Sequence, residues 1–479
     1  MKRLVEGILV AGCVVAASSL CGCSSAARGA LGDGNAAAFP PDSAGNDADS
    51  PDDADSSLGP SPSGQCTQAA LVLVASDAGD DGGDDGGLEC GTAGVADLVA
   101  AGTAFAMAFL PVALVDDGAI AENAVVSPYS VSSAMMMVDV GAEGETQSQI
   151  ESVLSLPGNG AAEASASSGL VCALQAAGSS NGNSLSIANS LWGQQGVSFE
   201  APFLDVLATG YGAPLQTVDF AGNPTAAVAT INAWVSQATQ GTISSPLGSQ
   251  DITELTRLVA VNAVYFKGTW AMGFNPSMTS PRPFTLANGK PTTVSTMSGL
   301  ISAGVGATSA LLVVELPYRA SSGSSLAMDI LMPTGGSAGL AAFESALTPA
   351  TLSSALASLH GRFMYTIQMP KFSFGTRIEL QPVLAALGMS DVFERGVADL
   401  SGMDGAMDLY LAAVVQQAMV EVDEQGTVAA AVTAGSSGCA LIAVEPPPPV
   451  QIDRPFFFLI RDTGNGAIVF MGQVVDPGE

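Results

Sequence analysis

A run of alternating apolar residues that ends in a glycine and a row of alanines constrains this chain more than any other stretch. Val414 to Asp423 shows the period of two expected of a buried strand. Glu424 to Thr433 then contains Gly426 and small side chains around Ala429 to Ala431. A glycine permits a hinge, and alanines offer little apolar surface to pack in a loop. The stretch suits a segment exposed in one state and inserted between strands in another, although an alanine-rich loop or short helix explains the same residues.

Several segments, in order along the chain, resemble the serpins, the serine protease inhibitor family. The stretch at Glu424 resembles the proximal hinge of the serpin reactive-centre loop. The other matching segments are Asn123 to Val131 (N-x-x-x-S-P-x-S), Ile187 to Trp192 (ANxLW), Ile231 to Ile243 (INxWVxxxTxGxI), Leu258 to Trp270 (LVLVNAIYFKGxW), Asp453 to Asp462 (DRPFLFLIRD) and Phe470 to Val474 (FMGRV). The resemblance covers roughly residues 96–477.

This resemblance implies an α+β fold in which helices pack on a large five-stranded sheet, with two further sheets and an exposed reactive-centre loop. The expected serpin domain spans residues 96–479, and its loop spans about 424–452. From the residues alone, Leu98 to Leu110 is predicted to be a helix because its apolar side chains recur at helical spacing. Ser127 and Pro128 are a good N-cap and first residue for a second helix.

Charge and composition exclude several classes of function. The formal net charge is −31, with only 14 Lys and Arg in 479 residues, so nucleic acid is not an expected partner. The single histidine, His360, argues against a Ser-His-Asp hydrolase and most zinc sites. We expect neither enzymatic activity nor a cofactor or metal ion.

The first 23 residues resemble an export signal. Lys2 and Arg3 precede a short apolar run from Ile8 to Ala17, which is too short to span a bilayer comfortably. Leu20 to Cys23 resembles a bacterial lipobox with Cys23 as the acylated residue. We therefore expect an exported lipoprotein at the outer membrane or cell surface, tethered to a membrane by acyl chains. Plain secretion to the extracellular space is the alternative.

Residues 24–95 read as an acidic linker rather than a folded domain. Ala, Gly, Asp, Ser and Pro dominate, so too little apolar surface exists to offset the entropy lost on folding. Like charges in Asp77 to Gly87 make the linker self-repelling. Cys66 and Cys90 could be bridged in an oxidising compartment.

The resemblance to serpins also implies a mechanism. A target serine protease would cleave the loop and form a covalent acyl complex, and the cut strand would insert into the large sheet before water releases the protease. The residues that match the hinge of this loop are Glu424, Gly426, Thr427, Ala429, Ala430 and Ala431. The protein is expected to act as a monomer. A non-inhibitory serpin that serves as a surface binding or structural protein is the competing possibility.

Two further groups of residues match serpin positions that support insertion. Ser127, Ser130, Asn262 and Gln416 match the polar cluster beneath the opening of the large sheet, known as the shutter. Gln416 stands where many serpins have histidine, and an amide can both donate and accept hydrogen bonds. Trp270 matches the tryptophan at the breach, where the loop first enters the sheet.

The cleavage site is predicted only as a window. Counting from Gly426 by the usual serpin length places the scissile residue at Ala440, followed by Leu441. Counting back from Pro455 gives a range from about Ala440 to Val444, and Cys439 and Ile442 belong to the same candidate region. All these side chains are small or apolar, so a trypsin-like pocket is not matched. Elastase-like, subtilisin-like or chymotrypsin-like proteases are the expected targets.

Overall fold

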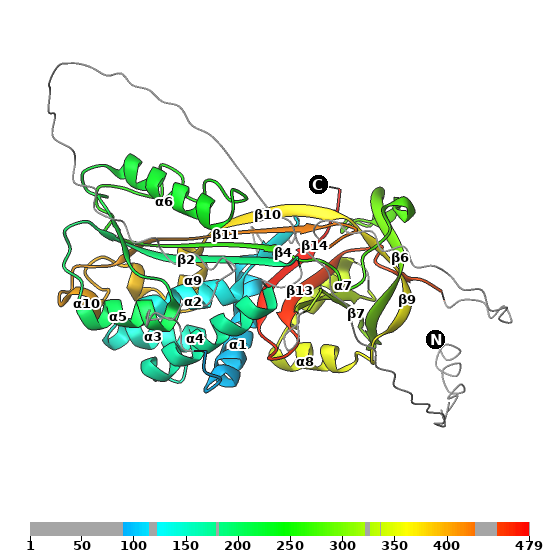
Figure 1. The fold of residues 1–479 in the computed structure, drawn as a ribbon, viewed down its shortest axis with the longest axis horizontal. Coiled ribbons are helices and arrows are strands. Elements are labelled where there is room, and N and C mark those ends of the chain that lie inside the picture. Colours follow the sequence, from blue (N-terminus) through cyan, green and yellow to red (C-terminus); the bar gives the residue numbers. More distant parts are fainter. Residues whose placement is uncertain are drawn as a thin grey trace, which may run out of the picture. The chain divides into compact units, whose positions relative to one another are not determined.

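The computed structural model describes residues 90–114, 122–178, 182–320, 326–335, 337–426 and 448–478. Two sheets organise this part of the chain (Figure 1). One sheet has nine strands, and the other has five and includes β11, which leads into the expected hinge.

The second sheet has five strands in the order β10-β11-β4-β2-β3. Its strands are β10 (Phe372–Glu379), β11 (Leu411–Val422), β4 (Leu258–Lys267), β2 (Ser184–Gln194) and β3 (Gln216–Val218). Nearly every residue of β4 is buried, because helices cover both faces of the sheet (Figure 1). The expected large five-stranded sheet is therefore confirmed.

The middle of this sheet departs from an antiparallel pattern. β4 pairs antiparallel with β2, and β11 pairs antiparallel with β10, yet β4 and β11 are parallel neighbours. Their register runs from Leu258 opposite Leu411 to Phe266 opposite Val420. Both strands consequently end at the same edge of the sheet, and β11 leads there into the hinge.

The other sheet is a nine-stranded path, β1-β14-β13-β8-β7-β6-β9-β12, with β5 paired to β6. Its strands are β1 (Ala124–Val126), β14 (Ile468–Val474), β13 (Phe456–Asp462), β8 (Leu326–Pro333), β7 (Leu311–Pro317), β6 (Pro291–Ala307), β9 (Phe363–Pro370), β12 (Val450–Gln451) and β5 (Ser280–Thr285). The two further sheets expected from the sequence are joined here, because the long β6 pairs with β7 at one end and with β9 and β5 along the rest.

The helices divide between the two faces of the five-stranded sheet. α6 (Pro224–Ala238) covers one face, and the opposite face packs on a group of helices (Figure 1). That group comprises α1 (Val95–Ala113), α2 (Pro128–Asp139), α3 (Gly144–Leu154), α4 (Gly160–Gly178), α5 (Ala201–Tyr211) and α9 (Leu380–Ala386). The remaining helices are α7 (Ser337–Ser345), α8 (Pro349–Ala357), α10 (Ser401–Asp404) and the 3₁₀ turns η1 (Pro276–Met278) and η2 (Asp391–Phe393).

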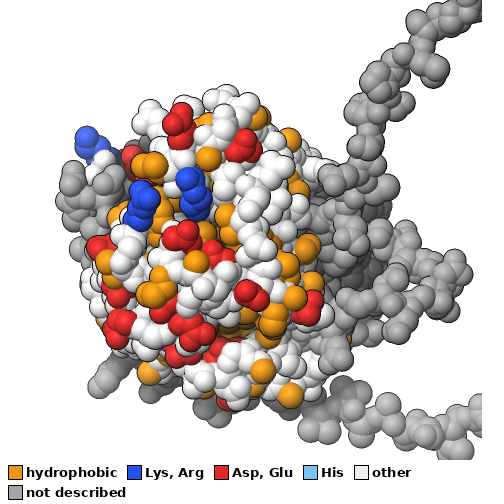
Figure 2. All heavy atoms as spheres, turned by 90° about the vertical axis from the view of Figure 1, so that its left-hand side faces the viewer, with side chains coloured by type: hydrophobic (Ala, Val, Ile, Leu, Met, Phe, Trp, Pro, Cys, Tyr) orange, Lys and Arg blue, Asp and Glu red, His pale blue; other side chains and the backbone are white. Residues whose placement is uncertain are grey.

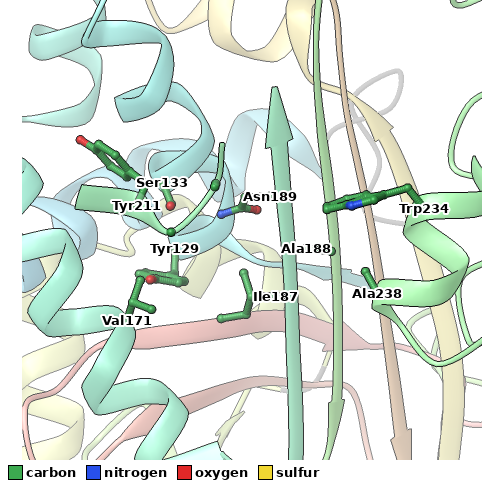
Figure 3. Close-up of a pocket in the computed structure, with 11 residues that line it drawn as sticks. Tyr129, Ser133, Val171, Ile187, Ala188, Asn189, Tyr211, Trp234 and Ala238 are labelled. Carbon is green, nitrogen blue, oxygen red and sulfur yellow. The ribbon is translucent and has the colours of Figure 1, made fainter. Parts of the chain in front are cut away.

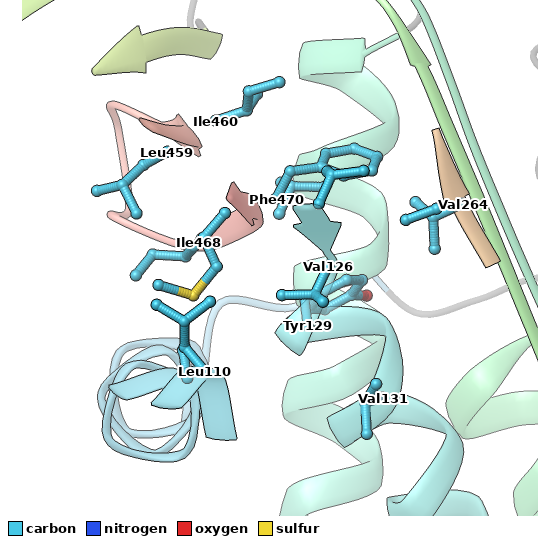
Figure 4. Packing of buried hydrophobic residues seen from close by; sticks show 14 of the residues in the cluster. Leu110, Val126, Tyr129, Val131, Val264, Leu459, Ile460, Ile468 and Phe470 are labelled. Carbon is cyan, nitrogen blue, oxygen red and sulfur yellow. The ribbon is translucent and has the colours of Figure 1, made fainter. Parts of the chain in front are cut away.

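α2 lies at the centre of the main hydrophobic core. Every residue from Pro128 to Asp139 is buried, and Ser127 caps the helix by accepting a hydrogen bond from the Ser130 amide. Figure 4 shows Tyr129 of α2 beside Val126 of β1 and below Phe470 of β14. Among the described helices, α1 alone has the length and apolar composition to cross a membrane, but Phe105, Phe109 and Leu110 are 0–1% exposed, as in a core helix.

The disulfide differs from the expected pairing. Cys90 is bonded to Cys172 of α4, so the bridge to Cys66 that the sequence left open does not form; Cys66 itself lies outside the described residues. Cys172 lies three residues after Gly169 of α4, which packs against Gly91 and Val95 at the start of α1. The expected boundary at residue 96 also placed Cys90 in the linker, although a covalent bond fixes it to the folded domain.

Surface charge agrees with the acidic composition. Figure 2 shows Asp and Glu side chains spread over one face, with the few Lys and Arg side chains toward one edge of the view. The described residues visible there form no continuous basic patch of the kind that contacts a phosphate backbone. His360 is exposed and follows α8.

Candidate functional site

Gly426, four residues after the end of β11, occupies a position where any side chain would force the surrounding backbone to move. Gly426 has φ +91°, and a Cβ built there would lie 2.3 Å from the Gly268 carbonyl oxygen and 2.5 Å from the Trp270 amide nitrogen. A side chain would therefore meet both an unfavourable backbone conformation and a backbone clash. The hinge glycine inferred from the sequence is thus held tightly against the end of β4.

Backbone hydrogen bonds fasten the residues before Gly426 to the segment that follows β4. The Trp270 amide donates to the Gln425 carbonyl (3.0 Å), and the Phe274 amide donates to the Glu424 carbonyl (2.6 Å). The Trp270 indole Nε1 also donates to the Asp423 carbonyl (3.0 Å). The hinge is consequently anchored at the edge where β4 and β11 both end.

Glu424 adds a side-chain anchor at the same place. Its carboxylate accepts from Lys371 Nζ at 2.8 Å and from Thr279 Oγ1 at 2.7 Å. Burial by itself raises the pKa of Glu424, but these two hydrogen bonds outweigh it, so the pKa lies below its ordinary value. Glu424 is therefore ionised at neutral pH and ties β11 to the strand connection at Lys371.

The buried side chain of Trp270 packs next to the residues that lead into the hinge, Asp423 to Gln425. It is 2% exposed and stacks on Tyr318, with ring centroids 4.5 Å apart and an interplanar angle of 8°. Tyr318 in turn meets Phe266 edge-on at 4.9 Å. Aromatic burial of this extent fixes the position of the indole, whose N–H then has a defined acceptor. The breach residue expected from the resemblance lies directly under the hinge.

A buried polar cluster lies farther down the same strands. The structure brings together all four residues expected there, Ser127, Ser130, Asn262 and Gln416, each no more than 1% exposed. Gln416 of β11 donates from Nε2 to Asn262 Oδ1 (2.7 Å) and to the Ser127 carbonyl (2.9 Å), and its Oε1 accepts from the Ser127 amide (3.0 Å). The two parallel strands are therefore bridged to each other and to the start of α2.

Asn189 of β2 completes this cluster, although the sequence interpretation did not assign it a role. Its Oδ1 accepts from Asn262 Nδ2 (2.7 Å) and from Ser130 Oγ (2.6 Å), and Asn262 also donates to Ser130 Oγ. Gln416, Asn262 and Asn189 occupy one row across three strands, since they are opposite one another in the pairing register. An amide at 416 satisfies these bonds without a titrating group.

A small cavity of about 20 Å³ borders the cluster beside Asn189 (Figure 3). Figure 3 shows Tyr129, Ser133 and Tyr211 on one side of β2, and Trp234 and Ala238 of α6 on the other. A space of this size accommodates about one water molecule. It is too small to be a substrate site, so it belongs to the packing of the cluster.

The far end of α2 carries a buried acid. Asp139 is 4% exposed, and its Oδ1 has no hydrogen-bond partner among the described residues. Burial, followed by the charges of Glu151 on α3 and Glu163 on α4, raises the pKa of Asp139 to about 7. The negative end of the helix dipole lies there as well, which also disfavours the carboxylate.

We expect the thermal midpoint to fall as the pH rises from 6 to 8, and Asp139→Asn to reduce this fall. The folded state holds a proton up to about pH 7, whereas the unfolded chain releases it near the ordinary pKa of 3.8, so stability is lost as Asp139 ionises. One such group accounts for about 1.4 kcal/mol over this interval. Thermal scans of both proteins at each pH measure the effect. Burial also raises the pKa of Glu344 to about 7, so Glu344→Gln should remove a separate part of the fall in thermal midpoint between pH 6 and 8. If the thermal midpoints of wild type and Asp139→Asn fell equally with pH, the assignment of this effect to Asp139 would be contradicted.

Several predicted site residues lie outside the described residues. They are the hinge residues Thr427, Ala429, Ala430 and Ala431, the reactive-bond candidates Cys439, Ala440, Leu441 and Ile442, and the lipidation candidate Cys23. Their assignments remain predictions from the sequence.

Comparison with known proteins gives matches that cover most of the chain. The model of a family described as serpin (serine protease inhibitor) matches residues 100–477. The leukocyte elastase inhibitor of Homo sapiens is 36% identical over 365 residues, which cover 74% of this chain and 94% of that protein. The glia-derived nexin of Mus musculus is 33% identical over 362 residues, which cover 74% of this chain and 88% of that protein.

Solved structures agree with this match. Native protease nexin-1, crystallised with heparin, has a TM-score of 0.69 at 29% identity and covers 80% of this chain and 100% of its own. Uncleaved ovalbumin has a TM-score of 0.71 at 26% identity and covers 79% of this chain and 100% of its own. The matched region includes the five-stranded sheet, the polar cluster and both described ends of the reactive-centre loop.

Proposed function

The chain belongs to the serpin family, and from this premise we propose that it inhibits serine endopeptidases of elastase-, subtilisin- or chymotrypsin-like specificity by a suicide-substrate mechanism. The observation that carries the proposal is the parallel pair β4–β11 with the hinge attached at its end. Serpins are protease inhibitors rather than enzymes, so the protease supplies the catalysis.

An inserted strand would have to separate β4 from β11, which are paired with each other in the structure. A segment that reversed direction at Gly426 and entered between β4 and β11 would be antiparallel to both strands. One parallel pairing would thereby be replaced by two antiparallel pairings, which are slightly more stable per residue. Polar groups now hydrogen-bonded between these two strands, above all Gln416 with Asn262, would have to exchange partners as the strands separate.

The length of the loop fits this insertion. β11 has 12 residues. If the protease cleaves after Ala440, residues 427–440 remain attached to Gly426, and they are sufficient to pair along the whole of β11. The free energy for moving the protease would come from the new strand pairings and from side chains that become buried.

Chemically, the proposed step is an interrupted proteolysis. The protease serine oxygen attacks the carbonyl carbon of the scissile residue, the peptide bond to the next residue breaks, and the new α-amine leaves with a proton delivered by the protease histidine. The product is an ester between protease and inhibitor. Inhibition results if insertion displaces the protease before water hydrolyses that ester.

Specificity follows from the side chains of the predicted window. Cys439 to Ile442 contains only small or apolar residues, which suit a shallow or hydrophobic pocket rather than one that binds Lys or Arg. Relatives named as leukocyte elastase inhibitors in Homo sapiens and Bos taurus are both 36% identical to the chain, which supports an elastase-like target.

The decisive experiment mixes the full-length protein with pancreatic elastase and, separately, with subtilisin, and resolves the products on denaturing gels. We expect a covalent band of combined mass together with a released C-terminal peptide, whose N-terminal sequence identifies the scissile bond. A fragment starting at Ala96 is unsuitable, because it lacks Cys90. Cleavage without any complex by these enzymes and by chymotrypsin would contradict inhibition and favour a non-inhibitory binding or structural role.

We also propose that the protein is exported and held at the outer membrane or cell surface through lipid on Cys23. The basic residues, apolar run and lipobox-like sequence of the first 23 residues support this location. Metabolic labelling with a fatty acid, compared between wild type and Cys23→Ser, tests it: incorporation should depend on Cys23. Incorporation that persists in the variant would contradict lipidation at this residue.

A further inference from the structure

Four strands near the end of the reactive-centre loop curl into a small ring. β5 pairs with β6, β6 with β9, and β9 with β12. The two outer strands then meet, because the Thr285 amide at the end of β5 donates to the Asp453 carbonyl just after β12 (2.8 Å). This closure leaves a pocket of about 180 Å³ at one end of the ring.

Most of the pocket lining is polar, and Arg282, Thr296, Gln368 and Gln451 belong to one face of these strands. Its lining residues are Arg282, Pro283, Thr296, Gln368, Gln451, Ile452 and Asp453. Arg282 is opposite Val294, two residues before Thr296, and Gln451 is opposite Gln368. Because alternate residues share a face, these side chains converge from separate strands rather than from one loop. We call this space the ring pocket.

Arg282 has hydrogen-bonding capacity that nothing described uses. Its Nη1 donates to Gln368 Oε1 at 3.3 Å, and Gln451 Nε2 donates to the same oxygen at 3.0 Å. The Arg282 Nε is buried, yet it has no hydrogen-bond partner among the described residues. A buried donor without an acceptor costs free energy, so an acceptor at this position would be stabilising.

The charge balance of the ring pocket favours an anion. Among the described residues, no carboxylate lies within ion-pair distance of Arg282. Asp453 also lines the pocket, but its Oδ1 accepts from Arg454 Nε at 2.8 Å. Asp453 is thus already paired with Arg454, which is not a lining residue, whereas the positive charge of Arg282 has no carboxylate partner among the described residues, in a protein whose overall charge is −31. The planar edge of a guanidinium matches the oxygens of a carboxylate or phosphate.

We infer that the ring pocket binds a small oxyanion, with one oxygen on Arg282 Nε and the remaining oxygens facing the Gln368, Gln451 and Thr296 side chains. Size agrees with this assignment, since a cavity of about 150 Å³ is sufficient for benzene, and carboxylates, sulfate and phosphate are no larger. The site lies outside the hinge and the polar cluster, so it does not depend on protease inhibition.

Occupancy would stabilise a weakly held strand. β12 contributes only Val450 and Gln451 to the pairing with β9, and it follows directly on the reactive-centre loop. An anion that bonds Arg282 on β5 and Gln451 on β12 would join the two outer strands of the ring. We therefore expect the Gln451 and Ile452 amides to exchange hydrogen more slowly when the pocket is filled.

The test uses the full-length protein and inorganic phosphate, with acetate as the carboxylate probe and chloride replacing either anion at constant ionic strength. We expect saturable 1:1 binding of at least one oxyanion by calorimetry. Arg282→Met should weaken that binding at least tenfold, and Arg282→Lys should weaken it less. Arg395→Met, which removes an exposed cation elsewhere, is the matched control and should bind as the wild type does.

A comparison of variants separates specific binding from the general effect of salts on stability. Excluded anions such as phosphate stabilise most folded proteins, so an equal rise in thermal midpoint for wild type and Arg282→Met would overturn the inference. Absence of saturable binding in the wild type would do the same. If Arg282→Met fails to fold, Gln451→Leu and the hydrogen exchange of Ile452 decide the question, because both leave Arg282 in place.

Discussion

Thr427→Arg is expected to turn the protein from an inhibitor into a substrate of its target protease. The resemblance to serpins assigns Thr427 to the face of the inserting strand that turns into the core, next to the tightly packed Gly426. Burying a guanidinium without a partner costs several kcal/mol. Each increment of about 1.4 kcal/mol in the barrier slows insertion tenfold, whereas deacylation is unaffected. The covalent band should therefore disappear while cleavage continues.

Val428→Arg is the matched control for this prediction. It adds the same side chain one residue later, and successive residues of a strand point to opposite faces. We expect its molar ratio of inhibitor to trapped protease to stay within about twofold of wild type, whereas that of Thr427→Arg rises at least tenfold, in line with the barrier estimate. Efficient trapping by Thr427→Arg would contradict insertion of this segment.

Replacing both Cys90 and Cys172 by serine is expected to lower the free energy of unfolding more than any other substitution proposed for this protein. The disulfide joins residues 82 positions apart, and the chain-entropy model assigns a closed loop of that length up to about 4.5 kcal/mol at 25 °C. The double variant should unfold at a markedly lower temperature or denaturant concentration. A reducing agent should lower the midpoint of the wild type toward that of the variant and leave the variant unchanged.

Cys66→Ser provides the control, because Cys66 was the alternative partner of Cys90. It should unfold at the wild-type midpoint if the Cys90–Cys172 bond accounts for the effect. A loss of stability in Cys66→Ser equal to that of Cys90→Ser would instead favour the Cys66–Cys90 pairing that the sequence left open.

Elements with strong local signals were predicted well. β4, which the sequence matched to a serpin segment, is largely apolar around Asn262 and ends before a glycine, and such a run is typical of a strand buried on both faces. The start of α2 was predicted from Ser127 and Pro128, whose capping chemistry is complete within four residues. In both cases neighbouring residues in the sequence determine the structure.

Features that depend on register or distant contacts were not predictable in the same way. Asn189 joins the polar cluster only because β2 and β4 pair with Asn189 opposite Asn262. Arg282 gave no signal in the sequence, since its role depends on the closure of four strands from distant segments. Cys172 was missed for the same reason. The scissile bond remains a window because serpin loops differ in length.

The Cys90–Cys172 bond also determines how the protein would carry mechanical load. Tension applied to the chain ahead of Cys90 would pass through the disulfide to α4, since that is the shortest covalent path to the rest of the molecule. Residues 91–171 would then bear no direct pull, and they include the whole of α2 with Ser127 and Ser130. A protein held by its N-terminal region could thus be stretched at its tether without strain on the helix that supports the opening of the sheet.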